Sequence, residues 1–163
     1  MPATRESKVT LKSKDNQLFD VGHEVIRECK ILLNVFEFAS VSSEPVLVAV
    51  EGKYLQIAIE FLTTFQHDPP YNPPANANGQ APPPDDDNGV TFWANHSNAD
   101  LEKVITVAEY LDAPRLIDYL CHVIWKRNKG STVEQMAAFF DIKDRLTPAD
   151  LAKLGVENAD YTV

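Results

Sequence analysis

The sequence of 163 residues contains 15 lysines and arginines against 24 aspartates and glutamates, which gives a net charge of -9 at pH 7. Nucleic acid and anionic membrane surfaces are bound by clustered basic faces, so we expect neither as a partner. Hydrophobic residues make up 44% of the chain, enough for one domain or for one small domain with a helical appendage.

The N-terminal residues MPATRESK have no apolar signal core, and we therefore expect a cytoplasmic or nuclear protein. No run approaches the roughly 18 apolar residues of a membrane-spanning helix. The two cysteines, Cys29 and Cys121, lie far apart and beside apolar residues. This placement favours two buried free thiols, with a single disulfide as the alternative.

The first half of the chain predicts a small sheet with helices. Residues 9–21 alternate apolar and polar side chains around the turn pair Asp15-Asn16, which is typical of a β-hairpin. Close-set apolar residues in 24–38 favour a buried pair of helices, and the apolar run 46–50 favours a strand. Residues 53–65 repeat apolar side chains at helical spacing, so we expect an amphipathic helix there.

The composition changes between Gln66 and Gly89, where seven of the eleven prolines and the run Asp85-Asp86-Asp87 occur. Proline without periodic apolar residues cannot contribute to a core, so we expect a mobile acidic loop. A recognition tract, with the prolines of 82–84 in a polyproline II helix, is the alternative.

Helical signals dominate from Val90 onward. Residues 99–110 predict one helix, and Asp112 is placed to cap a second whose apolar residues repeat over 116–124. Gly130 is the expected stop of that second helix, after basic residues that suit the negative end of the helix dipole.

Two more helices are predicted at the C-terminal end. Ser131 and Glu134 have the spacing of a capping box, and Thr147-Pro148 is typical of a helix start. The apolar residues of this part exceed what short helices bury by themselves. They either fold back onto the domain or form a groove for a partner's helices; they are Met136, Phe139, Phe140, Ile142, Leu146, Leu151 and Leu154.

Motifs for chemistry are missing from the sequence. No phosphate-binding glycine loop or nucleophile elbow occurs, and the four histidines are isolated from one another. The Asp85-Asp86-Asp87 run does not alternate its carboxylates as a calcium loop does. We therefore expect no catalytic residue, no cofactor and no metal, and predict a protein that is not an enzyme.

Several segments resemble the S-phase kinase-associated (Skp) adaptor family. Residues 110–121 are similar to its YLDIKGLLDxxC segment, and Lys129-Gly130 to its KGKTPEE turn. Residues 140–148 resemble its FNIKNDFTPEE signature, the most specific of these matches. Upstream, 9–19 are similar to the opening strand pair and Asp68-Pro69-Pro70 to the DDPP helix end.

The resemblance implies an α+β protein with a BTB/POZ fold, a small sheet with packed helices, extended by C-terminal F-box-binding helices. Its N-terminal part would span residues 1–68, the flexible loop 69–89 and the remaining BTB helices 90–126. The F-box-binding extension would then span 127–163.

The function implied is that of an adaptor in an SCF-type E3 ubiquitin ligase, which bridges a cullin scaffold to F-box substrate receptors. Glu109, Tyr110 and Leu111 would face the cullin. The residues expected to face an F-box protein are Leu101, Val104, Leu116, Leu120, Met136, Phe140, Ile142, Leu146, Leu151 and Tyr161.

Two departures from the family pattern bear on this function. Glu109 stands where the family usually has asparagine, and an unpaired buried carboxylate there would weaken cullin binding by roughly 1–3 kcal/mol. The ENQWC ending of the family lacks its tryptophan here, with Tyr161 as a displaced substitute. An alternative is therefore a structural or self-assembling BTB-fold protein without ligase function, including a homodimer through the BTB face.

Overall fold

The computed structural model describes residues 8–38, 44–74 and 81–140. In chain order its elements are β1 (Val9–Ser13), β2 (Leu18–Val21), α1 (His23–Ile26), α2 (Lys30–Phe38), β3 (Val46–Val48), α3 (Gly52–Thr63), α4 (Asn88–Thr91), the 3-10 helix η1 (Phe92–Asn95), α5 (Asn98–Leu111), α6 (Pro114–Asn128) and α7 (Val133–Phe139).

The sheet has the strand order β2-β1-β3. β1 pairs antiparallel with β2, with Val9 opposite Val21, and parallel with β3, with Leu11 opposite Val46. At the hairpin turn Asn16 has a φ of 65°, a left-handed conformation that asparagine tolerates better than most residues. The predicted hairpin and the strand after it are thus confirmed.

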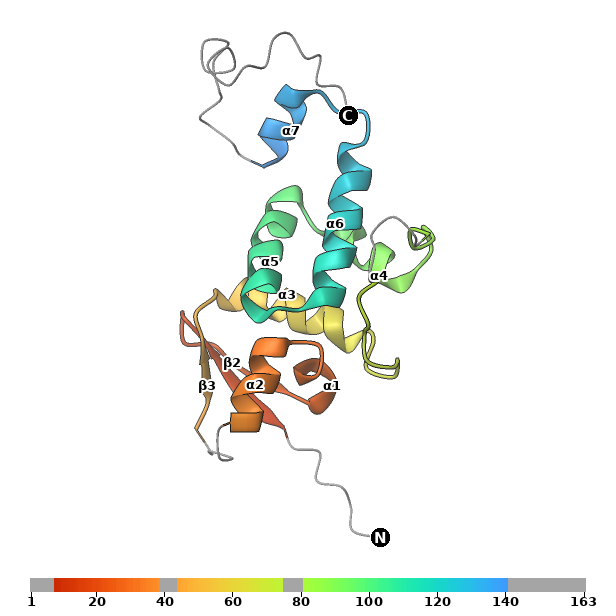
Figure 1. Ribbon diagram of the computed structural model, residues 1–163. Helices are drawn as coiled ribbons and strands as arrows, with labels where there is room; N and C mark the ends of the chain where they lie inside the picture. Colours follow the sequence, from red (N-terminus) through yellow and green to blue (C-terminus); the bar gives the residue numbers. More distant parts are fainter. Residues whose placement is uncertain (1–7, 39–43, 75–80, 141–163) are drawn as a thin grey trace, which may run out of the picture.

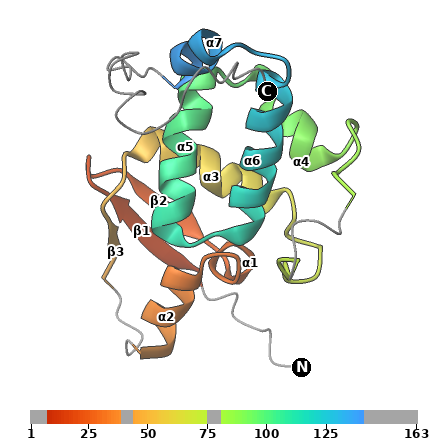
Figure 2. The same cartoon turned by 45° about the horizontal axis from the view of Figure 1, so that its top comes forward.

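Helices cover one face of the sheet, and α3 lies between the sheet and the helices α5 and α6. α5 and α6 lie side by side above α3, and α1 and α2 lie beside the sheet (Figures 1 and 2). One hydrophobic core joins these elements. The predicted α+β class, a small sheet with packed helices in the manner of a BTB/POZ fold, is confirmed; the largest fully buried side chains are Trp93, Phe61, Leu11, Leu32, Leu55, Leu62, Leu101, Leu111, Leu116 and Leu120.

The described flanks of the proline-rich segment contact α6. Tyr71 Oη donates a hydrogen bond to Asp118 Oδ2 at 2.5 Å, and Lys126 forms an ion pair with Asp85. The Asp87 side chain caps α4 by accepting from the Gly89 N–H at 2.7 Å. Composition alone indicated none of these contacts. Residues 75–80 of the expected mobile loop lie outside the described residues.

The connection between α5 and α6 differs from the prediction. Asp112 does not cap the start of α6; it is the C-cap of α5, with a φ of 48°. Aspartate adopts this left-handed conformation more readily than most residues, which suits it to end a helix. Ala113 is the N-cap of α6 without a side-chain hydrogen bond, and Pro114 opens the helix.

The capping box of α7 is displaced by one residue from its predicted position. Thr132, rather than Ser131, accepts from the Gln135 N–H at 3.2 Å, and Gln135 Oε1 accepts from the Thr132 N–H at 2.9 Å. Gly130 ends the preceding turn with a φ of 80°, which favours glycine. The predicted helix start at Thr147-Pro148 lies outside the described residues.

The two cysteines are free, and only one of them is buried. Burial, and secondarily the Glu28 carboxylate, raises the pKa of Cys29 to about 12. Cys121 is exposed on α6, which corrects the prediction for that thiol: it lies off the buried stripe formed by Leu116, Leu120 and Val123. Within the described residues no helix is long and apolar enough to cross a membrane.

Candidate partner-binding surfaces

Tyr110 marks an exposed apolar region where α5 meets β3. Its side chain is 42% exposed, and its Oη accepts a hydrogen bond from the Ala49 N–H at 3.3 Å. Two residues before Ala49, Leu47 is 69% exposed on β3, an edge strand of the sheet. An exposed aromatic ring with a satisfied hydroxyl, together with an exposed leucine on the adjoining strand, is typical of a protein-binding surface.

The start of α2 joins the same region through Asp112. The Lys30 N–H donates to the Asp112 carbonyl oxygen at 3.1 Å, and Lys30 Nζ lies 3.8 Å from Asp112 Oδ1. The next residue, Ile31, is 41% exposed. We call the exposed large hydrophobic residues of these three elements, Ile31, Leu47 and Tyr110, the Tyr110 surface.

The predicted cullin-facing residues divide between surface and core. Glu109 and Tyr110 are exposed, whereas Leu111 is only 2% exposed and packs in the hydrophobic core. The prediction for Leu111 therefore needs correction: in the last turn of α5 only one side of the helix faces solvent. Its contribution is to hold α5 in place.

A second exposed region lies on the end of α6 and on α7, remote from the sheet (Figure 1). Trp125 is 51% exposed, and Lys129 Nζ lies 5.4 Å from the centroid of its ring. On α7, Val133 is 44% exposed. We call the exposed apolar residues of this region, Trp125 and Val133, the Trp125 surface.

Two residues predicted to face an F-box protein, one on α7 and one at its C-cap, are half-buried. Met136 and Phe140 are of intermediate exposure, and the Phe140 ring lies edge-on to that of Phe139 with centroids 4.9 Å apart. Both side chains therefore keep part of their surface exposed. Four other predicted residues lie outside the described residues; they are Ile142, Leu146, Leu151 and Tyr161.

Four residues predicted to face an F-box protein are core residues instead. Leu101 and Val104 of α5 and Leu116 and Leu120 of α6 are each 0% exposed. Their periodicity is genuine, but the apolar stripe that they form faces the other helices of the domain. None of them presents its side chain to a partner in this structure.

Several exposed residues escaped the sequence analysis. Trp125 has a signal, because a large aromatic residue stands outside the buried stripe of α6. Leu47 and Ile31 have no such sequence signal, because each lies within an apolar run that is typical of a buried segment. Only their positions in the folded structure distinguish these two exposed residues from their buried neighbours.

Polar groups suited to chemistry do not gather at either surface. Among the described residues no three histidine, cysteine, aspartate or glutamate side chains are placed to hold a metal ion. His122 Nε2 is buried on α6 and has no hydrogen-bond partner in the part of the chain that the structure describes. What both surfaces offer is apolar area with charged edges, which suits protein binding.

Known proteins resemble the chain over nearly its whole length. Residues 7–67 match the family model described as Skp1 family, tetramerisation domain. SKP1-like protein 9 of Arabidopsis thaliana is 29% identical over 156 residues, covering 93% of this chain and 94% of that protein.

Two further relatives widen the comparison. SKP1-like protein 20 of Oryza sativa subsp. japonica is 29% identical over 171 residues, with 97% of each chain covered. The E3 ubiquitin ligase complex SCF subunit sconC of Arthroderma benhamiae is 25% identical over 159 residues, also with 97% of each covered. The similarity thus includes the helices that follow the matched domain.

Proposed function

The chain is a divergent member of the Skp1 family, and on that premise we propose that it is an adaptor subunit of an SCF-type E3 ubiquitin ligase. The observation that carries the proposal is near-full-length similarity to a protein named as an SCF subunit, which includes the helices beyond the family domain. A domain alone would support only the fold.

The two exposed surfaces suit a bridging role because they lie at opposite ends of the α5–α6 pair. Tyr110 is at the end of α5 near the sheet, and Trp125 is near the end of α6 beside α7 (Figure 1). A helix rises about 1.5 Å per residue, so α6 separates the two surfaces by roughly 20 Å. Two partners could thus bind at the same time.

For the cullin we propose the Tyr110 surface. The hydrogen bond from the Ala49 N–H fixes the orientation of the Tyr110 ring, so little conformational entropy is lost when a partner packs on it. Rigid exposed tyrosines are frequent hot spots of protein interfaces. Glu109 extends this surface with a charge.

For the F-box protein we propose the Trp125 surface together with the half-buried side chains of Met136 and Phe140. An F-box is itself a small helical unit, and an exposed tryptophan beside a short helix offers it apolar area. The predicted contributions of Ile142, Leu146, Leu151 and Tyr161 stay predictions, as does a cytoplasmic or nuclear location.

The mechanism is positional. An adaptor that holds a substrate receptor and a cullin in one complex raises the effective concentration of the substrate at the catalytic arm. It does so without bond chemistry of its own, and we therefore propose a non-catalytic subunit that uses no cofactor.

Two single variants of the full chain test this function. Tyr110→Ala should weaken binding to a cullin N-terminal domain and leave F-box binding unchanged, and Trp125→Ala should do the reverse. Binding of each partner is measured separately by calorimetry. Failure of the wild-type chain to bind any cullin or F-box protein encoded in the same genome would contradict the proposal.

Self-association is the second candidate, and one observation favours it. Leu18 is 60% exposed on β2, the other edge strand of the sheet, where a second copy could pair. Sedimentation measurements on the wild-type chain and on Leu18→Lys test this. A concentration-independent monomer that binds a cullin would exclude the self-assembling alternative.

A further inference from the structure

Glu109 is an acidic residue at the unfavourable end of a helix. It lies in the last turn of α5, where the N–H of Asp112 donates to its carbonyl oxygen. The C-terminus of a helix carries a partial negative charge, so a carboxylate there is disfavoured and a cation is favoured. The last turn of α5 holds no basic residue.

The lysine that the fold brings to the end of α5 is already engaged. Lys30, which the backbone of α2 brings to the end of α5, forms its ion pair with Asp112 at 3.8 Å. In residues 8–38, 44–74 and 81–140, no lysine or arginine forms an ion pair with Glu109. Its charge is therefore exposed and not balanced within the described fold.

The Cys121 thiol of α6 lies within reach of the Glu109 charge. Burial raises the pKa of the Cys121 thiol, and the carboxylates of Asp118 and Glu109 raise it further. The charges of Glu109 and Asp118 thus act on the same thiol of α6. A partner that approaches the end of α5 meets a negative field beside the exposed ring of Tyr110.

We propose that Glu109 is a specificity-determining residue, which pairs with a lysine or arginine on the cullin surface that would pack against Tyr110. This inference rests on the proposed function and adds to it the chemical character of the partner. It reverses the expectation that a carboxylate at this position only weakens the contact. A cullin with an acidic or purely apolar residue opposite Glu109 would bind more weakly than one with a basic residue there.

The position of the charge indicates which binding parameter it affects. Glu109 is exposed and lies at the edge of the Tyr110 surface, and charges at an interface rim act mainly on the association rate and on its salt dependence. For Glu109→Gln we expect binding to weaken about two- to fivefold at low salt, the range of an exposed ion pair. The difference should diminish at 0.5 M salt, where the Debye length is short.

The test uses the full chain and the N-terminal domains of all cullins encoded in the same genome. Association rates and affinities are measured by surface plasmon resonance at 0.05 and 0.5 M salt for wild type, Glu109→Gln and Glu109→Lys. The matched control is Glu102→Gln, which removes the same charge from α5 two helical turns away. Tyr110→Ala reports on the surface itself.

The expected result is a salt-dependent loss with Glu109→Gln, a larger loss with Glu109→Lys, and little change with Glu102→Gln. Reversing the charge of the opposing cullin residue should restore binding to Glu109→Lys. If Tyr110→Ala weakens binding but Glu109→Gln leaves it unchanged or tightens it, the specificity role is overturned and the adaptor function stands. If no cullin binds the wild-type chain, both are overturned.

Discussion

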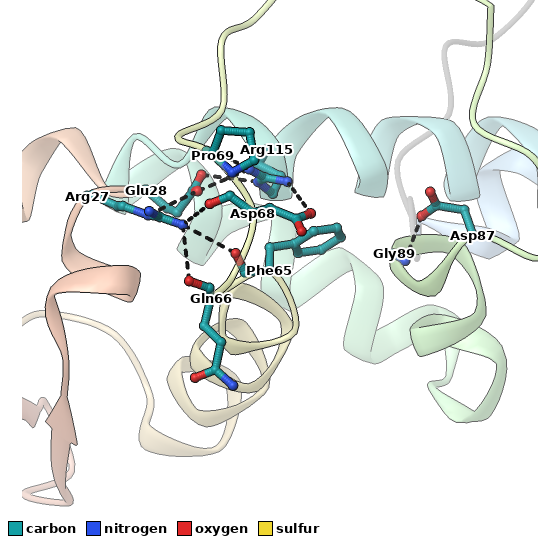
Figure 3. A network of polar contacts seen from close by, with 9 residues as sticks. All are labelled: Arg27, Glu28, Phe65, Gln66, Asp68, Pro69, Asp87, Gly89 and Arg115. Carbon is teal, nitrogen blue, oxygen red and sulfur yellow. Dashed lines mark hydrogen bonds and ion pairs between the residues drawn. The ribbon is translucent and has the colours of Figure 1, made fainter.

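Glu28 and Arg115 form an ion pair in the interior of the protein. Arg115 Nε and Nη2 donate to the two carboxylate oxygens of Glu28 at 3.3 and 3.2 Å, and the two side chains are 8% and 2% exposed, respectively. Figure 3 shows Glu28 between Arg115 and Arg27, with the end of α3 below them. The pair joins the turn after α1 to the first turn of α6.

The same two arginines hold the chain that leaves α3. Arg115 Nη2 donates to the Pro69 carbonyl oxygen at 2.9 Å, and Arg27 Nη2 donates to that of Asp68 at 2.5 Å. The Arg115 guanidinium also lies 4.5 Å from the centroid of the Phe65 ring. The Asp-Pro-Pro segment noted in the sequence therefore links the ends of α1, α3 and α6 through hydrogen bonds.

Replacing Glu28 with glutamine should destabilise the protein by up to about 3–5 kcal/mol, because it removes the buried carboxylate partner of Arg115 and leaves the guanidinium with only the half-exposed Asp68 carboxylate, 3.7 Å from Nη1. The double variant Glu28→Gln with Arg115→Met should recover part of that loss. Urea denaturation measures both. Lys14→Met is the control: its ion pair with Glu51 is more than half exposed, so a change under about 1 kcal/mol is expected. An equal effect of Lys14→Met and Glu28→Gln would contradict the argument.

Thr132→Ala should lower the free energy of unfolding of α7 by about 1 kcal/mol, because it removes the acceptor for the Gln135 N–H. Ser131→Ala lies one residue away and should have almost no effect. Hydrogen exchange of the amides of α7 distinguishes the two variants. Greater exchange in Ser131→Ala than in Thr132→Ala would show that the cap is at the position predicted from sequence.

The contribution of Asp15 to stability should depend on pH in the acid range. Its carboxylate accepts hydrogen bonds from the Ser13 hydroxyl and from the Gly52 N–H, and these lower its pKa to about 2 from an ordinary value of 3.8. Because the folded pKa is the lower one, the stabilisation is fully present above about pH 4 and is lost as the pH falls toward 2.

The urea midpoint of Asp15→Asn should therefore approach that of wild type as the pH is lowered from 6 to 2. A second measurement isolates the cause: Ser13→Ala removes the largest of the stabilising hydrogen bonds and should raise the NMR titration midpoint of Asp15. A constant gap between the two proteins at every pH would count against this account.

Leu120 and Trp125 should separate folding from binding on a single helix. Leu120→Ala removes a fully buried side chain and should cost about 2–5 kcal/mol of stability. Trp125→Ala should change stability by about 1 kcal/mol or less, because half of the ring is exposed, yet weaken binding of an F-box protein. Thermal unfolding and calorimetry are the two measurements; a larger loss of stability in Trp125→Ala would make it a core residue.

The sequence predicted the elements well because their signals are local. The hairpin turn at Asp15-Asn16, the periodic apolar residues of α3 and the glycine after α6 each depend on a few adjacent residues. Caps were predicted less well. Aspartate suits both ends of a helix, and the neighbours Ser131 and Thr132 both have the side chain of an N-cap, so local chemistry did not decide between the positions.

The candidate site was harder to predict, because an apolar stripe has the same pattern whether it faces a core or a partner. Leu101 and Leu120 were therefore assigned to an interface although each lies in the core. The pairing of Glu28 with Arg115 had no signal at all, since 87 positions separate the two residues. Only the assembled fold brings them together.

The separation of Glu28 and Arg115 along the chain determines when their ion pair can form during synthesis. A ribosome adds about 5–20 residues per second, so on the order of ten seconds pass between the synthesis of Glu28 and that of Arg115. During this interval Glu28 has the longer contact to Arg27 Nε, at 3.8 Å in the folded protein, but lacks the two hydrogen bonds from Arg115, so burial of its carboxylate is less favourable. The buried ion pair is therefore complete only after α6 has left the exit tunnel, and we expect the N-terminal layer to gain its full stability at that point.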